Sequence, residues 1–199
     1  MAVPPEVQLA WFSSALEELE DFLLSRDTFR PLRSAPQGMR QDLSLGGLLL
    51  ARDTLQVGEG DLSSSARADW SRLRARWDSE RSRHAAAIER KATAELLNRC
   101  NLWRAYLGEL GEKPDEGRAY PTEVRHRVII DRLREHLATS SADPATTLLD
   151  RLDKTLRHWL AEGPFVWSDA LRGAYPQARF WYLYGRPEPG LIAANPPQL

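Results

Sequence analysis

Apolar residues recur along most of the chain at intervals of three and four, which is the spacing of one face of an α-helix. The first series is Phe12, Leu16, Leu19 and Leu23, and it predicts a helix over about residues 5–26. Similar series follow, separated by proline, glycine and serine residues that end helices. They predict further helices over about residues 43–56, 66–110, 121–138 and 144–162.

The segment 66–110 is unusually long for one helix of a compact protein. It contains no proline, and its only glycine is Gly108. Unbroken, it would measure about 67 Å, whereas a compact chain of this size has a radius of gyration of about 16 Å. The helix must therefore kink, protrude or pack against a second chain. Its apolar stripe lapses over residues 78–84, where we place any kink. A second copy of the chain could cover part of this stripe, and we therefore predict self-association through this long helix.

The C-terminal region has a different pattern, because two short runs are apolar on both sides. Phe165-Val166-Trp167 follows a Gly-Pro break, and the second run, FWYLY, covers residues 180–184. A platform that stacks bases or sugars needs basic groups along a groove, but only Arg179 and Arg186 flank the second run. Short apolar runs between turns are typical of buried segments. We therefore predict a structural aromatic plug formed by Phe165, Trp167, Phe180, Trp181, Tyr182 and Tyr184.

These patterns predict an all-α protein. We expect a bundle of about five helices, with one very long helix over about residues 66–110 and a short non-helical aromatic segment at the C-terminus. Residues 1–186 would form a single domain. The last part, residues 187–199, is rich in proline and predicts a mobile tail.

Composition narrows the class of protein. The hydrophobic content of 42% and the charged content of 28% are ordinary for a soluble domain. The net charge of −1 argues against strong global attraction to nucleic acid or to anionic membranes. The chain has one cysteine, Cys100, which lies on the apolar stripe and is expected to be a buried, inert thiol. No apolar run approaches membrane-spanning length, so we expect a cytoplasmic protein without a membrane partner.

Arginine dominates the basic residues, with 24 arginines and 3 lysines. Residues 67–91 carry eight basic and four acidic side chains, with Trp70 and Trp77 among them. Such a segment could follow a phosphate backbone. The two tryptophans lie on the apolar face, however, so a hydrated or salt-bridged face is favoured and nucleic-acid binding is not expected. The candidate anion-binding or nucleic-acid-binding residues are Arg72, Arg74, Arg76, Arg81 and Arg83.

Catalytic signatures are absent from the sequence. It contains no phosphate-binding loop, no dinucleotide fingerprint, no nucleophile elbow and no HExxH motif. Glu123 and His126 have the ExxH spacing that helical metal sites use, but a well-bound metal needs at least three converging ligands. Chance occurrence is favoured for this pair, and no cofactor is expected.

Three functional hypotheses follow, in order. The first is a protein-interaction or structural module without catalytic activity. The second is an arginine-lined protein that binds anions or nucleic acid. The third is an enzyme whose site is assembled only in the folded chain, which sequence spacing does not exclude.

Overall fold

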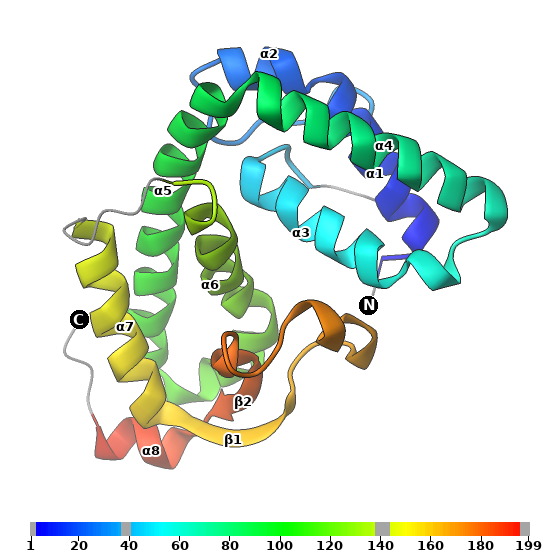
Figure 1. Ribbon diagram of the computed structural model, residues 1–199. Coiled ribbons are helices and arrows are strands. Elements are labelled where there is room, and N and C mark those ends of the chain that lie inside the picture. Colours follow the sequence, from blue (N-terminus) through cyan, green and yellow to red (C-terminus); the bar gives the residue numbers. More distant parts are fainter. Residues whose placement is uncertain (1–2, 37–40, 138–143, 196–199) are drawn as a thin grey trace. The chain divides into compact units, whose positions relative to one another are not determined.

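A computed structural model describes residues 3–36, 41–137 and 144–195, and most of these residues are helical (Figure 1). The α-helices in chain order are α1 (Pro5–Glu17), α2 (Leu19–Leu24), α3 (Leu45–Val57), α4 (Ser64–Arg83), α5 (Ala85–Glu112), α6 (Tyr120–Arg134), α7 (Pro144–Trp159) and α8 (Pro189–Ala194). Strands β1 (Leu160–Phe165) and β2 (Tyr184–Pro187) form one small sheet. Short 3-10 helices are η1 (Glu59–Asp61), η2 (Pro114–Ala119), η3 (Asp169–Ala174) and η4 (Trp181–Leu183).

The chain divides into two compact units. The N-terminal unit comprises Met1–Glu95 and Arg132–Leu137, and the C-terminal unit comprises Leu96–Asp131 and Ala138–Leu199. Helices α5 and α6 contribute residues to both units. The predominance of helix confirms the all-α prediction. The described residues form eight α-helices instead of five, whereas the bundle arrangement and the single domain over residues 1–186 stay predictions.

Two of the predicted helices are divided. The predicted helix 5–26 breaks at Glu18, which separates α1 from α2. The predicted helix 66–110 breaks at His84, inside the interval 78–84 in which the apolar stripe lapses. The backbone at His84 has φ −110° and ψ 28°, but its N–H still donates to the Glu80 carbonyl and its carbonyl accepts from Ile88. The break therefore leaves helical hydrogen bonding on both sides intact.

In the N-terminal unit, α1 packs on α3 and α4. The rings of Phe12 and Trp70 meet edge to face, with centroids 5.5 Å apart. The indole N–H of Trp11 donates to the Gln41 carbonyl at 3.0 Å, so this buried ring also has its polar group satisfied. Ser44 caps α3 by accepting a hydrogen bond from the Gly47 N–H, which satisfies one of the backbone donors left free in the first turn of a helix.

The apolar stripe of α4 and α5 is buried within the chain itself. Its buried members are Trp70, Trp77, Ile88, Ala92, Leu96, Cys100, Trp103, Leu107 and Leu110. Folding of the chain has already covered this stripe, so the stripe does not support its being shared with a second copy. Burial of the Cys100 side chain is confirmed. Self-association stays a prediction, and it requires another face.

In the C-terminal unit, α7 ends at Trp159 and the chain continues directly into β1, before the Gly163-Pro164 pair at which the sequence placed the helix end. Strand β1 pairs antiparallel with β2, from Leu160 opposite Pro187 to Phe165 opposite Tyr184, and the register shifts between Glu162 and Phe165 (Figure 1). Gly163-Pro164 lies in this irregularity, where a residue without an N–H is tolerated.

Glycine is required at one position of β2. A Cβ on Gly185 would lie 2.3 Å from the carbonyl oxygen of Ala161 and 3.1 Å from the Leu160 side chain. No backbone oxygen can approach a side-chain carbon so closely, so the tight pairing of β1 and β2 depends on this glycine.

The two predictions for the C-terminus need correction. The segment predicted as non-helical contains η3 and η4 beside its two strands. Residues 187–195 form regular structure where a mobile, extended tail was expected, because Pro187 ends β2 and α8 follows. Ile192 is 1% exposed, and the Trp159 indole N–H donates to the Asn195 carbonyl at 2.7 Å. Residues 196–199 of the predicted tail lie outside the described residues. Within the described ranges, no helix is long and apolar enough to cross a membrane.

Candidate functional site

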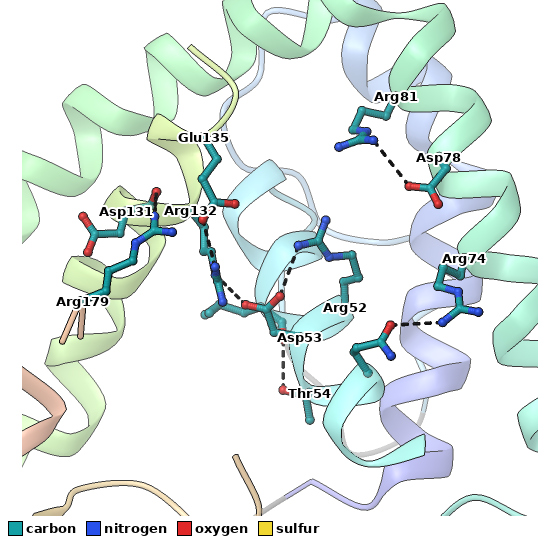
Figure 2. A network of polar contacts seen from close by, with 12 residues as sticks. Arg52, Asp53, Thr54, Arg74, Asp78, Arg81, Asp131, Arg132, Glu135 and Arg179 are labelled. Atoms are coloured by element: carbon teal, nitrogen blue, oxygen red, sulfur yellow. Dashed lines mark hydrogen bonds and ion pairs between the residues drawn. The ribbon is translucent and has the colours of Figure 1, made fainter. Parts of the chain in front are cut away.

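The five candidate arginines of α4 all contact groups of their own unit. Arg72 pairs with Asp69, Arg74 with Gln56 and Glu59, Arg76 with the Leu16 carbonyl, Arg81 with Asp78 and Arg83 with Glu80. Figure 2 shows the contacts of Arg74 and Arg81. The ion pairs are exposed, at 3.6 to 3.8 Å for Arg74, Arg81 and Arg83, and such pairs contribute only about 0–1 kcal/mol each. The geometry supports a hydrated, salt-bridged face here.

Two arginines, one on α4 and one on α5, contact the C-terminal ends of other helices. Arg76 donates to the Leu16 carbonyl in the last turn of α1, and Arg90 donates to the Leu23 carbonyl in the last turn of α2, each at 2.9 Å. Neither α1 nor α2 has a basic residue in its own last turn. Positive charge stabilises the carbonyl end of a helix. These arginines therefore act as structural caps supplied from a neighbouring helix.

A second polar cluster joins α3 to the end of α6 within the N-terminal unit (Figure 2). Arg132 donates from Nε to Asp53 Oδ2 at 2.7 Å and from Nη1 to Glu135 Oε1 at 2.9 Å, and Arg52 lies 3.3 Å from Asp53 Oδ1. Asp53 is buried. Burial lowers the pKa of the nearby His136, and the positive charges of Arg81 and Arg52 lower it further. The cluster pairs its charges internally, which favours a structural role.

A buried polar network lies in the C-terminal unit and centres on Arg127. Its Nε and Nη2 atoms donate to the two carboxylate oxygens of Asp153, both at 2.8 Å, and its Nη1 lies 2.6 Å from Asp131 Oδ1. The Tyr182 hydroxyl donates to Asp131 Oδ2 at 2.8 Å. The guanidinium also lies over the Tyr182 ring, 4.6 Å from its centroid. Helices α6 and α7 are thereby connected to η4.

The electrostatics of this network favour a fixed arrangement. Burial is the largest influence on the pKa of Arg127 and lowers it, but the hydrogen bond to Asp153 and the charges of Tyr182, Asp131 and Asp153 together outweigh burial, so that the arginine pKa is raised. Burial also raises the pKa of Tyr182 well above its ordinary value, so its hydroxyl keeps its proton. Each of these side chains contacts another member of the network, which favours a structural role.

This network was not among the sites predicted from the sequence. One signal for it is present in the sequence, because Arg127 and Asp131 are one turn apart on a face that also carries Val124 and Val128. A charge on an apolar helical face indicates a buried partner. The third member, Asp153, lies on another helix, and sequence spacing does not identify it.

The candidate metal pair, Glu123 and His126, does lie together in the structure. His126 Nδ1 contacts Arg99 Nη1 at 3.1 Å and therefore accepts the hydrogen bond, while Nε2 lies 3.6 Å from Glu123 Oε2. Burial, followed by the charges of Arg99 and Arg125, lowers the pKa of His126 to about 4. The neighbouring arginines repel a metal cation, and the described residues contain no group of three His, Cys, Asp or Glu side chains that could bind one.

The six aromatic residues of the predicted plug lie in the C-terminal unit and contact one another or their neighbours. Phe165, Phe180, Tyr182 and Tyr184 are buried, whereas Trp167 and Trp181 are partly exposed. Ring centroids are 5.2 Å apart for Phe165 and Tyr184, and 5.1 Å apart for Tyr175 and Phe180. The Trp167 indole N–H donates to the Pro121 carbonyl at 2.7 Å. The buried rings contact one another in tilted and edge-to-face arrangements, which is unlike an open stacking platform.

Two hollows in the described surface have room for a small ligand. One, of about 530 Å³, is lined by Arg151, Lys154, Thr155, His158, Trp159, Ala194 and Asn195. The other, of about 430 Å³, is lined by Glu6, Leu9, Ala10, Ser13, Asp69, Arg72 and Leu73. The first gathers three basic side chains, all on α7, whereas the second contains both signs of charge.

Two of the exposed leucines in the described part of the chain lie on α5, away from its buried stripe. Leu97 is 56% exposed and Leu102 is 42% exposed. We define the α5 outer face as Leu97, Asn98, Asn101, Leu102, Arg104, Ala105, Gly108 and Glu109, all of which are exposed or partly exposed. At 100° per residue, Arg104 and Glu109 lie on opposite edges of this face, and its centre carries no charge before Glu112, the last residue of α5. Leu97 and Leu102 do not belong to the apolar stripe. Their position outside the stripe was the sequence signal that could have identified this face.

Comparisons with protein families, with curated proteins and with solved structures find no match to this chain. The function must therefore be inferred from the chemistry of its own surfaces. Of these, the α5 outer face departs most clearly from an ordinary hydrated surface.

Proposed function

We propose that this protein is a protein-interaction module without catalytic activity, and that it binds its partner through the α5 outer face. The observation that carries the proposal is the pair of leucines, Leu97 and Leu102, which remain 56% and 42% exposed on an ordered helix. Removing apolar surface from water contributes about 25 cal/mol for each Å². A partner that covers both leucines therefore gains free energy that the isolated chain leaves unused.

The helix beneath this face supports recognition. Trp103 and Leu107 are buried on its opposite side, and the Trp103 ring stacks on Tyr106 with centroids 5.6 Å apart. The backbone is thus held in place before a partner arrives, which lowers the entropy lost on binding. Uncharged residues at the centre and charged residues at the edges match the anatomy of protein interfaces. Paired, buried charges elsewhere in the chain favour the same class over an enzyme.

Site-specific photo-crosslinking in the native cell tests this function. A photoreactive amino acid at Asn101, in the centre of the face, should form a covalent adduct with a partner protein. Leu97→Glu with Leu102→Glu should abolish the adduct. Leu24→Glu is the matched control, since Leu24 is 68% exposed on α2 and lies outside the face. Circular dichroism should show an unchanged helical content in both variants. Absence of any adduct from Asn98, Asn101 and Ala105 would contradict the proposal.

Anion binding is a second candidate function, and the hollow on α7 and α8 favours it. Arg151, Lys154 and His158 line the hollow, which has a volume of about 530 Å³, and its described lining residues include no acidic side chain. His158 Nδ1 contacts the Lys154 carbonyl at 2.7 Å, which directs Nε2 elsewhere. Titration with inorganic phosphate should then shift the His158 ring resonances, and Arg151→Gln with Lys154→Gln should remove the shift. Unchanged resonances at millimolar phosphate would exclude this candidate.

A further inference from the structure

We infer that the partner of the α5 outer face is a second copy of this chain, with the two α5 helices side by side and parallel. This inference rests on the proposed function, because it names the partner of the same surface. It differs from the sequence prediction of self-association, which used the apolar stripe now found buried. The evidence is the spacing of the charged and apolar residues along the two edges of the face.

The charges on the face are complementary to themselves in one orientation. Arg104 and Glu109 lie on opposite edges and are five residues apart. Consider a parallel pair of α5 helices related by a two-fold axis along the helices. The Arg104 edge of each copy then lies beside the Glu109 edge of the other copy. Across this boundary, a residue of one helix contacts the residue about five positions later in the partner helix. Arg104 of each copy would therefore pair with Glu109 of the other, giving two ion pairs across the interface.

The leucines repeat the same relation one heptad earlier. Leu97 precedes Arg104 by seven residues, Leu102 precedes Glu109 by seven, and the two leucines are again five residues apart. The same register thus brings Leu97 against Leu102 of the partner. The same parallel register therefore pairs the leucines with each other and the opposite charges with each other. A face with a random arrangement of residues would not be expected to do both.

The residues between the two edges permit a close approach. Asn98, Asn101, Ala105 and Gly108 occupy the positions that correspond to the centre of a parallel coiled coil. Ala105 and Gly108 are small, so the backbones can approach closely there. Asparagine at such positions fixes register and orientation through a hydrogen bond to its counterpart. The centre would therefore specify the pairing more than stabilise it.

An antiparallel pair would not use these features. It places each edge beside the same edge of the partner, so Arg104 would face an edge that carries Leu97 and Arg104, and Glu109 would face an edge that carries Leu102 and Glu109. No ion pair would form. The face spans only about four turns, so the interface belongs to the small, transient class. We expect a dissociation constant on the order of 1–100 µM.

Charge exchange with sedimentation equilibrium tests the pairing. The 22.6 kDa chain should show a concentration-dependent mass that approaches two chains. Arg104→Glu and Glu109→Arg should each weaken the dimer about tenfold or more, and the double exchange should restore it. Both side chains are exposed, so folding should be retained, and Glu109 loses only an exposed contact with Lys113 at 3.8 Å. Arg83→Glu, on α4, is the matched control and should leave the mass unchanged.

Cysteine crosslinking tests the orientation. Asn98→Cys and Ala105→Cys, examined separately, should both form intermolecular disulfides, because a parallel two-fold pair brings every central residue close to its own counterpart. An antiparallel pair could link at most one of them. The wild-type chain is the control, since Cys100 is completely buried and should not crosslink.

The outcomes separate the two proposals. A monomeric mass up to about 1 mM, well above the expected constant, would overturn the dimer. If photo-crosslinking at Asn101 then still captured a different protein, the proposed function would stand without this inference. Crosslinking at only one of the two cysteine positions, or failure of the double charge exchange to restore the dimer, would also overturn the parallel pairing. Absence of both a dimer and any adduct would overturn both proposals.

Discussion

Arginine plays two different structural roles in the two units of this protein. In the N-terminal unit, exposed arginines such as Arg76 and Arg90 contact carbonyl groups at helix ends. In the C-terminal unit, Arg127 is buried and holds the carboxylates of Asp153 and Asp131. The side chain and its charge are the same in both units, so the two roles differ because the arginines differ in their access to water.

That difference decides how much each contact contributes to stability. An exposed cation at a helix end remains hydrated and contributes about 0.3–1 kcal/mol. A buried guanidinium has lost its water, so it depends completely on its partners. Removing one member of such a network leaves an uncompensated charge, which costs about 3–5 kcal/mol. The number of contacts made by an arginine is therefore a poor guide to its importance here.

The largest expected effect is that of Arg127→Met. Asp131 and Asp153 would lose their shared partner, and the free energy of unfolding should fall by about 3–5 kcal/mol. Urea unfolding followed by circular dichroism measures this change. Arg151→Met, on the exposed face of α7, is the control and should alter stability by less than about 0.5 kcal/mol. A loss below about 1 kcal/mol for Arg127→Met would remove the contrast between the units.

Phe180→Ala should have an effect of similar size. The ring is buried and contacts Tyr175 and Tyr182, at centroid distances of 5.1 and 6.1 Å. Truncating a buried phenylalanine costs about 3–5 kcal/mol. Trp181→Ala should cost less, because Trp181 is only partly buried and stacks under Arg157 at 3.7 Å. Equal losses for the two variants, measured by urea unfolding, would contradict the burial pattern. No loss for either would contradict the structural plug.

Tyr182→Phe sharpens the comparison by removing one hydroxyl. Asp131 Oδ2 would lose the hydrogen bond from Tyr182, while the ring would still lie against Arg127. Leaving a buried acceptor unsatisfied costs about 1–3 kcal/mol. Thermal unfolding should show a clear decrease in melting temperature with unchanged helical content. An unchanged melting temperature would indicate that water replaces the hydroxyl, and that the network is less buried than its geometry implies.

Arg90→Ala tests the weaker type of contact. Loss of the hydrogen bond to the Leu23 carbonyl should cost about 0.3–1 kcal/mol. Arg72→Ala, which removes only an exposed ion pair with Asp69, should cost no more than about 0.5 kcal/mol. The difference should shrink in high salt, since salt screens exposed charges. A loss above about 2 kcal/mol for Arg90→Ala would show that exposure does not separate the two roles of arginine.

The smallest expected effect is a pH dependence from His126. Its pKa of about 4 in the folded chain lies below the ordinary value of 6.5, so the unfolded chain takes up a proton first as the pH falls. The contribution of neutral His126 to stability is therefore complete above about pH 6.5 and is lost as the pH falls toward 4. His136 is shifted in the same direction. His126→Gln should lose less melting temperature between pH 7 and pH 4.5 than the wild type. Equal losses would contradict this assignment.

Much of the candidate site was present in the sequence without being recognised. The apolar stripe correctly predicts the buried face of α5, and Leu97 and Leu102 are the leucines of α5 that the stripe omits. Exposure of these leucines depends on which elements cover the helix, and local spacing does not contain this information. The arginines of α4 are the opposite case, because the sequence suggested a site that the structure does not favour. Their number suggested an anion site, but three of them pair with Asp78, Glu80 and Glu59.

The sequence by itself determined the helical class of the protein, the buried stripe through Trp70, Cys100 and Trp103, and the interval in which the long helix breaks. Each of these follows from periodicity or from a short stretch of charged residues, which act over a few turns of helix.

The tertiary structure alone decided which elements meet. Arg127 and Asp153 are 26 residues apart, and Tyr182 and Asp131 are 51 residues apart. The proline-rich C-terminus becomes β2 and α8 because Trp159 and β1 offer it hydrogen bonds and an apolar surface. A helical pattern in the sequence indicates that an apolar face must be buried. It does not indicate which segment of the chain packs on that face. That choice depends on the path of the whole chain, because loop-closure entropy rises so slowly with length that distant segments compete almost equally for the same surface.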